Sequence, residues 1–229
     1  MDERDGLTES QRSTLARFAG LLRASPHNLL SPRGLSELED RHFPEGVAFA
    51  RILPSVERVL DVGSGGGLPG VIVAIARPDL EVHLLEATRK KADFLADVVM
   101  ALGLAATVHH GRAEELATGE LGEGFDVVCA RAVAPLERLV PWCAPYLRPG
   151  GLLYAIKGER WADELKAAAR ALTAARMSVL LTPASRAPES GPGDAPRVVV
   201  LERARSMSSG PGLRPSRTRQ DVVGDITKE

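Results

Sequence analysis

Five glycines within ten residues, in "DVGSGGGLPG" at positions 61–70, constrain the fold of this chain more than any other stretch. Glycine is costly inside a helix or strand, so such a cluster marks backbone that bends sharply or lies against another group. The apolar run Val59-Leu60 precedes the cluster, and the helical pattern "LPGVIVAIAR" overlaps its end. The stretch therefore predicts a strand, a glycine loop and a helix in that order. A tight structural turn is the alternative to a ligand-binding loop.

Beyond this loop, strands alternate with helices along the chain. Apolar runs typical of buried strands are separated by stretches with helical periodicity. The predicted strands after the first are "EVHLLEA", "AATVHHG", "FDVVCARA" and "GLLYAIKG", and then "MSVLLT" and "RVVVLE" across a Gly/Pro-rich loop at 183–196. Thr88 is expected to cap a helix that ends at Gly103. This alternation predicts an α/β fold with a parallel, doubly wound, Rossmann-like sheet.

The segments on either side of this alternating region differ from it in composition and in apolar pattern. Residues 1–56 form an N-terminal helical segment, in which Thr8 and Gln11 match a capping box and a shorter helical stretch covers Leu35–Arg51. Residues 57–204 make up the predicted catalytic domain. From Arg205 the chain is rich in Ser, Gly, Pro and Arg without an apolar period, so residues 205–229 are expected to be a disordered tail.

Composition excludes several classes of protein. The net charge of −1 excludes a globally basic nucleic-acid coat, although a local basic face remains possible. Two cysteines form neither a disulfide framework nor a zinc motif, so we expect no metal site. The N-terminus is acidic and polar, unlike a signal peptide, and no apolar run is long enough to span a bilayer. We therefore expect a cytoplasmic protein, monomeric and without membrane contact.

The residues around the glycine loop narrow the class of ligand. A phosphate-binding P-loop requires Gly-Lys-Ser/Thr, and the dinucleotide pattern G-x-G-x-x-G fails because Leu68 stands at its last glycine. Asp61 suits a cationic amino-acid ligand, and Glu86, at the end of the next strand, is placed to accept both hydroxyls of a ribose. An adenosyl ligand with an amino-acid tail and no pyrophosphate fits these features, which predicts S-adenosylmethionine. The expected contacts are Asp61, Gly63, Gly65, Gly67 and Glu86.

Charged residues follow three further strands, at the sheet edge expected to hold the cofactor. Arg112 and Glu114 follow the third strand, Arg131 the fourth and Lys157 the fifth. Arg131 and Lys157 are assigned to the catalytic edge, as partners of a phosphate or of the cofactor carboxylate rather than groups facing the reacting base. The alternatives are a rim salt bridge for Arg131, a solvated turn for Lys157, and a favourable helix-dipole contact for Glu114.

Basic residues also open the helix after the second strand. Arg89, Lys90 and Lys91 oppose the helix dipole there, so local helix stability does not explain them. Lys90 and Lys91, with Arg112, are predicted to contact RNA phosphates; a solvated helix face is the alternative.

Other candidates have plainer interpretations. Cys129 lies in an apolar strand and is interpreted as a buried core thiol. His109 and His110 are interpreted as structural. Trp142 and Tyr146 share helical spacing, which indicates packing rather than a base-stacking platform.

These residues together resemble the bacterial RsmG (GidB) family, the guanine-N7 methyltransferases of small-subunit (16S) ribosomal RNA. The resemblance runs from about Asn28 to Arg203 and is carried by "LDVGSGGGLPG", "LLEATRKKADFL", "GRAEE", "ARAVAPL" and "AIKGE". It implies a class I methyltransferase fold and a target guanine in the decoding-region loop of that RNA, free or in the assembling subunit. It also implies that Glu86 binds the ribose and that the cofactor pocket includes Gly63, Leu68, Ala113, Glu114 and Arg131.

The chain departs from the family pattern in two places. Lys91 stands where the family usually has arginine, and Phe43-Pro44-Glu45-Gly46 follows His42 where the family usually has Ile-Leu-Asp-Ser.

The chemistry favours a ring nitrogen as the methyl acceptor. Guanine N7 carries a free lone pair and no proton, so its methylation requires no general base. The chain has Ala130-Arg131-Ala132-Val133 where amine methyltransferases have an Asp/Asn-Pro-Pro-aromatic motif, and it contains no Pro-Cys for cytosine-C5 methylation. Two rival functions stay open: a small-molecule methyltransferase of the same fold, and a non-catalytic ribosome-assembly factor.

Overall fold

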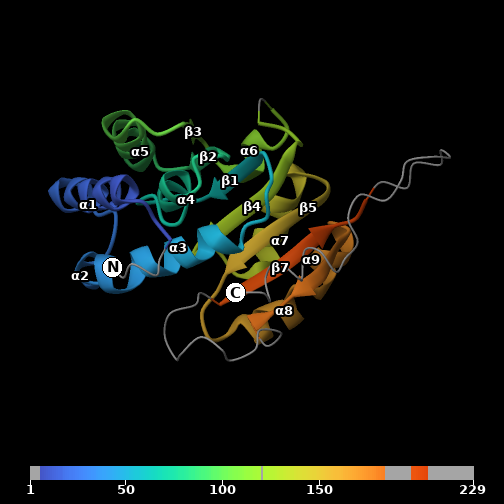
Figure 1. The fold of residues 1–229 in the computed structure, drawn as a ribbon. Helices are drawn as coiled ribbons and strands as arrows, with labels where there is room; N and C mark the ends of the chain where they lie inside the picture. Colours follow the sequence, from blue (N-terminus) through green and yellow to red (C-terminus); the bar gives the residue numbers. More distant parts are fainter. Residues whose placement is uncertain (1–5, 120, 184–196, 206–229) are drawn as a thin grey trace.

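A seven-stranded sheet with helices on both faces forms the centre of the molecule (Figure 1). The computed structural model describes residues 6–119, 121–183 and 197–205. Apart from Arg205, the expected disordered tail lies outside these residues, as does most of the Gly/Pro-rich loop. The strands are β1 (Arg58–Val62), β2 (Glu81–Glu86), β3 (Ala106–His110), β4 (Phe125–Arg131), β5 (Leu147–Ile156), β6 (Met177–Leu181) and β7 (Val198–Arg203).

The strands lie in the order β3-β2-β1-β4-β5-β7-β6 across the sheet. The chain therefore begins in the interior of the sheet with β1, adds β2 and β3 on one side, and then adds the remaining strands on the other side. β1 pairs in parallel with both β2 and β4, so the chain reverses its winding direction between β1 and β4. Ligands of open α/β sheets bind at this kind of switch point, beyond the carboxyl ends of the strands. The glycine loop follows β1 and therefore lies there.

One part of the sheet differs from the predicted parallel arrangement. β7 runs antiparallel to both of its neighbours, β5 and β6. The predicted helices alternate with strands only as far as β6, and an antiparallel pair requires no helical crossover between its strands. The doubly wound prediction is thus confirmed for β1 to β5, and the parallel prediction is wrong for β7.

Two groups of helices cover the two faces of the sheet. The N-terminal elements are α1 (Glu9–Ala24), α2 (Pro32–Ser36), the π-helical turn η2 (Leu38–His42) and α3 (Phe43–Ile52). With α4 (Gly70–Ala76) and α5 (Arg89–Leu102) they share one buried core against the sheet. The other face packs against α6 (Ala113–Leu116), α7 (Leu136–Cys143), the 3₁₀ turn η3 (Ala144–Tyr146), α8 (Trp161–Ala167) and α9 (Ala169–Ala174).

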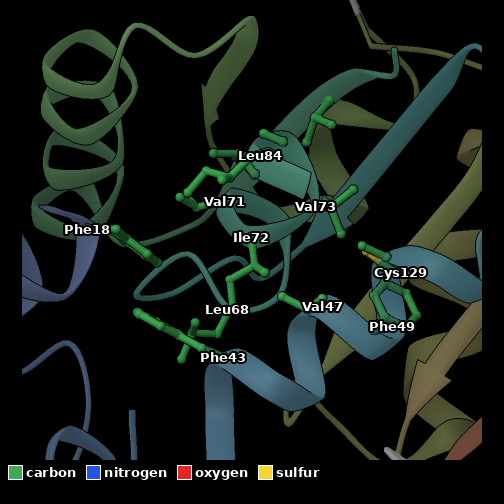
Figure 2. Close-up of a cluster of buried hydrophobic side chains, with 14 of the residues drawn as sticks. Phe18, Phe43, Val47, Phe49, Leu68, Val71, Ile72, Val73, Leu84 and Cys129 are labelled. Atoms are coloured by element: carbon green, nitrogen blue, oxygen red, sulfur yellow. The ribbon is translucent and has the colours of Figure 1, made fainter. Parts of the chain in front are cut away.

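The N-terminal helices begin as predicted and then divide. Thr8 and Gln11 form both bonds of the capping box on α1. The single helical stretch expected over Leu35–Arg51 is instead three short elements, and Pro44 lies in the first turn of α3, where its missing N–H costs no helical bond. The Phe18 ring of α1 stacks on the Phe43 ring at a centroid distance of 5.8 Å (Figure 2). This packing joins α1 to α3, and both helices share their core with α4, the helix that follows the glycine loop.

Candidate active site

The glycine loop bends back over the end of the sheet through a left-handed conformation at Gly63. Gly63 has φ +72°, and its N–H donates to the Leu85 carbonyl oxygen of β2 at 2.8 Å. A Cβ added at this position would lie 2.6 Å from Val133 Cγ2. Glycine is therefore required both by the backbone conformation and by the close approach of the loop that follows β4.

Glu86 links the glycine loop to the start of α5. Its buried carboxylate accepts hydrogen bonds from Gly65 N at 2.9 Å and from Thr88 N at 2.7 Å. Each carboxylate oxygen has a second lone pair, so these bonds leave room for a ribose hydroxyl. Thr88 stands at the N-cap of α5, but its side chain makes no capping bond, so that part of the expected cap does not form. Its N–H donates to the Glu86 carboxylate.

Asp61 points away from the cofactor side of the loop. Its side chain is 1% exposed; Oδ2 accepts from Gly70 N at 2.9 Å and Oδ1 from Cys129 Sγ at 3.7 Å. Burial raises the pKa of Asp61 to about 6. Asp61 therefore holds the start of α4, in contrast to the expected contact with a cationic ligand. The interpretation of Cys129 as a buried core thiol is confirmed.

Gly67 and Leu68 also face the core rather than a ligand. A Cβ at Gly67 would meet Val71 Cγ2 at 2.6 Å. The Leu68 side chain is buried beside Phe43 (Figure 2). This half of the loop packs against the N-terminal helices, so cofactor contacts of Gly67 and Leu68 stay a prediction for their backbone atoms.

A small cavity of about 120 Å³ lies beside the other half of the loop. Gly63 and Val133 form part of its wall, together with the turn into α6. The remaining lining residues include Leu85, Ala87, Arg112, Ala113, Glu114 and Trp142. Tyr146 OH donates to the Ala113 carbonyl oxygen at 2.6 Å and so fixes that turn. The structure thus brings Gly63, Ala113 and Glu114 together, as predicted.

Trp142 packs against the core on the α7 side of the sheet, as predicted, and it also faces a cavity. It lines the small cavity, and the Arg138 guanidinium lies 5.0 Å from the centroid of its ring. Its helical spacing with Tyr146 indicated the helix but carried no sign of a pocket, since the pocket forms only when α7 packs beside α6.

A larger cavity of about 720 Å³ opens beyond the carboxyl ends of β4 and β5. The loop Ala132–Pro135, called the β4–α7 loop below, forms its wall, and Val133 of this loop also lines the small cavity. The β4–α7 loop therefore separates the two cavities. Charged residues dominate the rest of the lining: Arg41, Glu45, Arg131, Lys157, Glu164 and Arg197.

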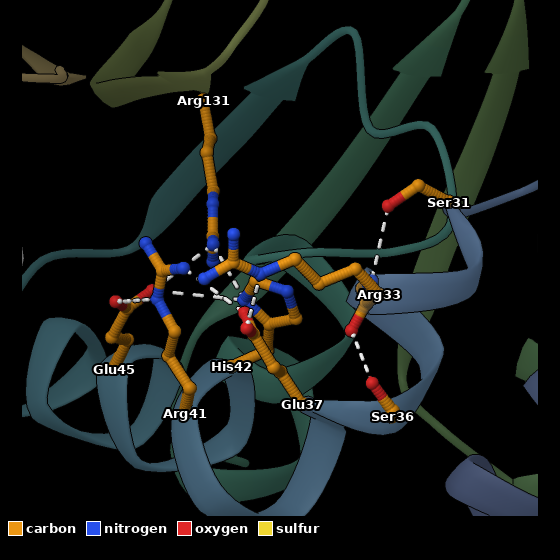
Figure 3. A network of polar contacts seen from close by, with 9 residues as sticks. Ser31, Arg33, Ser36, Glu37, Arg41, His42, Glu45 and Arg131 are labelled. Atoms are coloured by element: carbon orange, nitrogen blue, oxygen red, sulfur yellow. Dashed lines mark hydrogen bonds and ion pairs between the residues drawn. The ribbon is translucent and has the colours of Figure 1, made fainter.

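Arg131 lies in a network that joins the sheet to the N-terminal helices (Figure 3). Its guanidinium lies 2.7 Å from His42 Nδ1 and 3.0 Å from Glu45 Oε2, and its side chain is 17% exposed. Arg41 Nε binds the other Glu45 oxygen at 3.0 Å. The alternative interpretation of Arg131, a salt bridge, thus applies here, and Arg131 lines the larger cavity rather than the small one.

The charges of this network shift the titration of its members. Burial lowers the pKa of Arg131. Burial alone would raise the pKa of Glu45, but hydrogen bonds from His42 and Arg41 and the charge of Arg131 lower it to about 2. His42 and Glu45 were not predicted as site residues; their spacing of three on one helical face was the available signal, because it puts both side chains on the same side of the chain.

Lys157 is held inside the larger cavity. Its Nζ donates to the Ala134 carbonyl oxygen at 2.6 Å and pairs with Glu164 Oε2 at 2.9 Å, and the side chain is 6% exposed. The alternative of a solvated turn is therefore wrong.

The predicted RNA-contacting residues lie in the first turn of α5 and, for Arg112, at the wall of the small cavity. Lys90 is exposed and Lys91 half-buried in the first turn of α5, and Arg112 is 65% exposed at 4.0 Å from Glu114. Arg89 pairs with Asp93 at 2.9 Å. RNA contact and a solvated face both remain compatible with these positions.

The described part of the chain contains neither a metal-binding cluster nor a membrane-spanning helix. No group of three or more His, Cys, Asp or Glu residues with the geometry of a metal site occurs there. His83 Nδ1 lies 2.8 Å from His109 Nε2, so these rings bind each other. None of the described helices combines the length and apolar character needed to cross a bilayer.

Comparison with known proteins adds independent findings. The family described as rRNA small subunit methyltransferase G (GidB) matches residues 11–190. Ribosomal RNA small subunit methyltransferase G of Mycolicibacterium gilvum is 42% identical over 166 residues, which cover 72% of this chain and 73% of that protein. The protein of the same name from Mycolicibacterium paratuberculosis is 44% identical over 164 residues, which cover 71% of this chain and 66% of that protein.

A solved structure supports the fold. The O-methyltransferase from Bacillus cereus in complex with SAH superimposes with a TM-score of 0.52 at 14% identity, covering 86% of this chain and 92% of that one. At this identity the likeness concerns the fold alone. The family match extends over most of the chain, and the chain therefore belongs to the rRNA small subunit methyltransferase G (GidB) family.

Proposed function

We propose that this protein transfers a methyl group from S-adenosylmethionine to N7 of a guanine in small-subunit (16S) ribosomal RNA. The observation that carries the proposal is the pair of cavities that share the β4–α7 loop as their wall. Cavities that adjoin along one loop would place a cofactor in one next to an acceptor in the other. Family membership supplies the class of substrate.

The residues of the small cavity fit an adenosyl ligand. A Cβ at Gly63 would fill the space beside Val133, and Glu86 presents a buried carboxylate with free lone pairs next to the loop. Gly63, Gly65 and Glu86 would hold the ribose and amino-acid portions, and Ala113, Glu114 and Trp142 the adenine. S-adenosylmethionine, when bound, supplies an electrophilic methyl group.

The larger cavity fits an RNA acceptor that needs no base. Its carboxylates are both engaged, Glu45 with Arg41 and Arg131 and Glu164 with Lys157. Neither is free to remove a proton, and guanine N7 has none to remove. The chain's contribution is thus to orient the base and exclude water, as methyl transfer by in-line displacement requires. The cations Arg41, Arg131, Lys157 and Arg197 outnumber the carboxylates Glu45 and Glu164 in the lining, and this excess of positive charge favours RNA over a neutral small molecule.

Substitution of N7 in the target guanine tests the acceptor atom. Labelled S-adenosylmethionine is incubated with ribosomal RNA, free and in the assembled subunit, and the label is mapped. An RNA with 7-deazaguanine at the mapped position should bind with wild-type affinity and accept no label. Cleavage specific for N7-methylguanosine identifies the product. Label on the deaza RNA, or on N2, O6 or a ribose, would overturn the proposal, and absence of any turnover would favour the assembly-factor alternative.

The same assay covers the remaining expectations about partners. We propose that the protein acts as a monomer in the cytoplasm and without a metal ion. Methylation in the presence of a chelator, by protein that sediments as a monomer, is the expected result.

A further inference from the structure

The β4–α7 loop has a strained start. Ala132 has φ +56°, a left-handed conformation that a residue with a Cβ adopts only when its surroundings hold it there. The next residue, Val133, packs against Gly63 of the glycine loop. The loop is thus held in an unfavourable conformation between the two cavities, so its own sequence does not fix its position.

Contacts from outside the loop supply the missing restraint at its far end. Lys157 Nζ donates to the Ala134 carbonyl oxygen at 2.6 Å. Glu164 Oε2, from α8, accepts from Leu136 N at 3.1 Å, where α7 begins, and pairs with Lys157 at 2.9 Å. One carboxylate oxygen of Glu164 therefore joins both anchors of the loop. With side chains 6% and 26% exposed, Lys157 and Glu164 are largely shielded from water, which strengthens their attraction.

We propose that Glu164 is a positioning residue that fixes the β4–α7 loop, and through it the relative placement of cofactor and acceptor base. The inference rests on the proposed function. Methyl transfer depends on the alignment of donor, methyl and acceptor, and a shift of about 1 Å costs about 100-fold in rate. Glu164 is not among the residues that line the small cavity, and its bond to the loop is at Leu136 N. Replacing Glu164 should therefore slow methyl transfer without weakening cofactor binding.

Two substitutions separate the two contacts of Glu164. Glu164→Gln keeps an oxygen for the Leu136 N–H but presents no charge to Lys157. Glu164→Ala removes both the hydrogen bond to Leu136 N and the ion pair with Lys157. The matched control is Asp163→Asn, which removes the same charge from the exposed neighbouring position of α8.

We expect kcat for ribosomal RNA to fall about 10- to 100-fold in Glu164→Ala and by less in Glu164→Gln. The Kd of S-adenosylmethionine, measured by calorimetry, should stay within about twofold of wild type in both, and Asp163→Asn should match wild type. Amide hydrogen exchange at Leu136 should be faster in Glu164→Ala, because that N–H has lost its acceptor, and unchanged in Glu164→Gln.

Several results would overturn the inference. These are a wild-type kcat in Glu164→Ala, unchanged exchange at Leu136, or a loss of cofactor affinity as large as the loss of rate. Should Glu164→Ala not fold, Glu164→Gln decides, with a reduced kcat at unchanged cofactor Kd as the supporting result. The exchange measurement requires no substrate, so a failure of the proposed function, seen as wild-type protein that does not methylate RNA, is distinguishable from a failure of this inference.

Discussion

Gly63 ends β1 with φ +72°, and an added Cβ there would lie 2.6 Å from Val133 Cγ2. Gly103, at the C-terminus of α5, has φ +64° with no atom within 4 Å of an added Cβ. Both glycines have a left-handed backbone conformation, but only at Gly63 would an added Cβ also collide with a neighbouring side chain. The difference between them therefore isolates the contact between the glycine loop and the β4–α7 loop.

Substitution of each glycine by alanine tests that contact. Gly103→Ala should cost about 1–2 kcal/mol of stability, because a Cβ is unfavourable in the left-handed region, and should leave cofactor affinity unchanged. Gly63→Ala should pay the same cost and also displace Val133, so cofactor affinity by calorimetry should fall at least about tenfold. Wild-type affinity in a folded Gly63→Ala protein would show that this half of the loop does not adjoin the cofactor.

At the scale of elements, the start of α5 connects the cofactor side of the sheet to a basic surface. Glu86 binds the Thr88 N–H at 2.7 Å and so fixes the first turn that carries Lys90 and Lys91. Arg89 in the same turn is already paired with Asp93. Cations at a helix N-terminus are unfavourable locally, which leaves binding of a polyanion as a reason for their presence.

Replacing Lys90 and Lys91 by alanine distinguishes RNA contact from a solvated face. If both lysines bind phosphates, the negative slope of log RNA affinity against log salt concentration should become less steep by up to about 2. Cofactor affinity should stay unchanged. Lys166→Ala with Arg170→Ala, at exposed positions of α8 and α9, is the matched control and should keep the wild-type slope. A slope in Lys90→Ala, Lys91→Ala equal to the control would assign these residues to solvent.

At the scale of the whole molecule, the Glu45–Arg131 pair joins α3 of the N-terminal segment to β4 of the sheet. The apolar core that α1 and α3 share with α4 carries most of this attachment (Figure 2). The pair adds a contribution that depends on pH, because the pKa of Glu45 is lowered to about 2 from the usual 4.5.

The direction of that dependence follows from linkage. A carboxyl whose pKa is lower in the folded protein stabilises it fully above about pH 4.5, and the contribution is lost as the pH falls toward 2. Glu45→Gln should therefore lower the unfolding free energy by about 2 kcal/mol at pH 7, and the difference from wild type should shrink between pH 4.5 and 2. Urea denaturation at pH 7 and pH 3 measures this. A difference that is the same at both pH values would mean that the charge of Glu45 contributes nothing.

Much of the sheet was predictable because strand formation here depends on local pattern. "RVLDV" is β1 residue for residue, and α5 ends at Gly103 as predicted, with φ +64°. The motif residues Gly63, Ala113 and Glu114 meet at one cavity because parallel strands bring their carboxyl ends to one edge. Apolar runs, turn residues and their order along the chain thus determined the architecture and the edge that carries the site.

Tertiary packing alone decided which way individual side chains face and which distant residues meet. Asp61 binds Gly70 N and Leu68 packs in the core, although both belong to the glycine motif, because the N-terminal helices cover that side of the loop. Trp142 reaches the small cavity, Glu45 anchors Arg131 from a helix far away in sequence, and Glu164 joins Lys157 to the start of α7. The pattern of apolar and turn residues predicts the local conformation of a segment. These contacts depend instead on how distant segments pack together, because burial and charge pairing select residue pairs that no spacing in the sequence encodes.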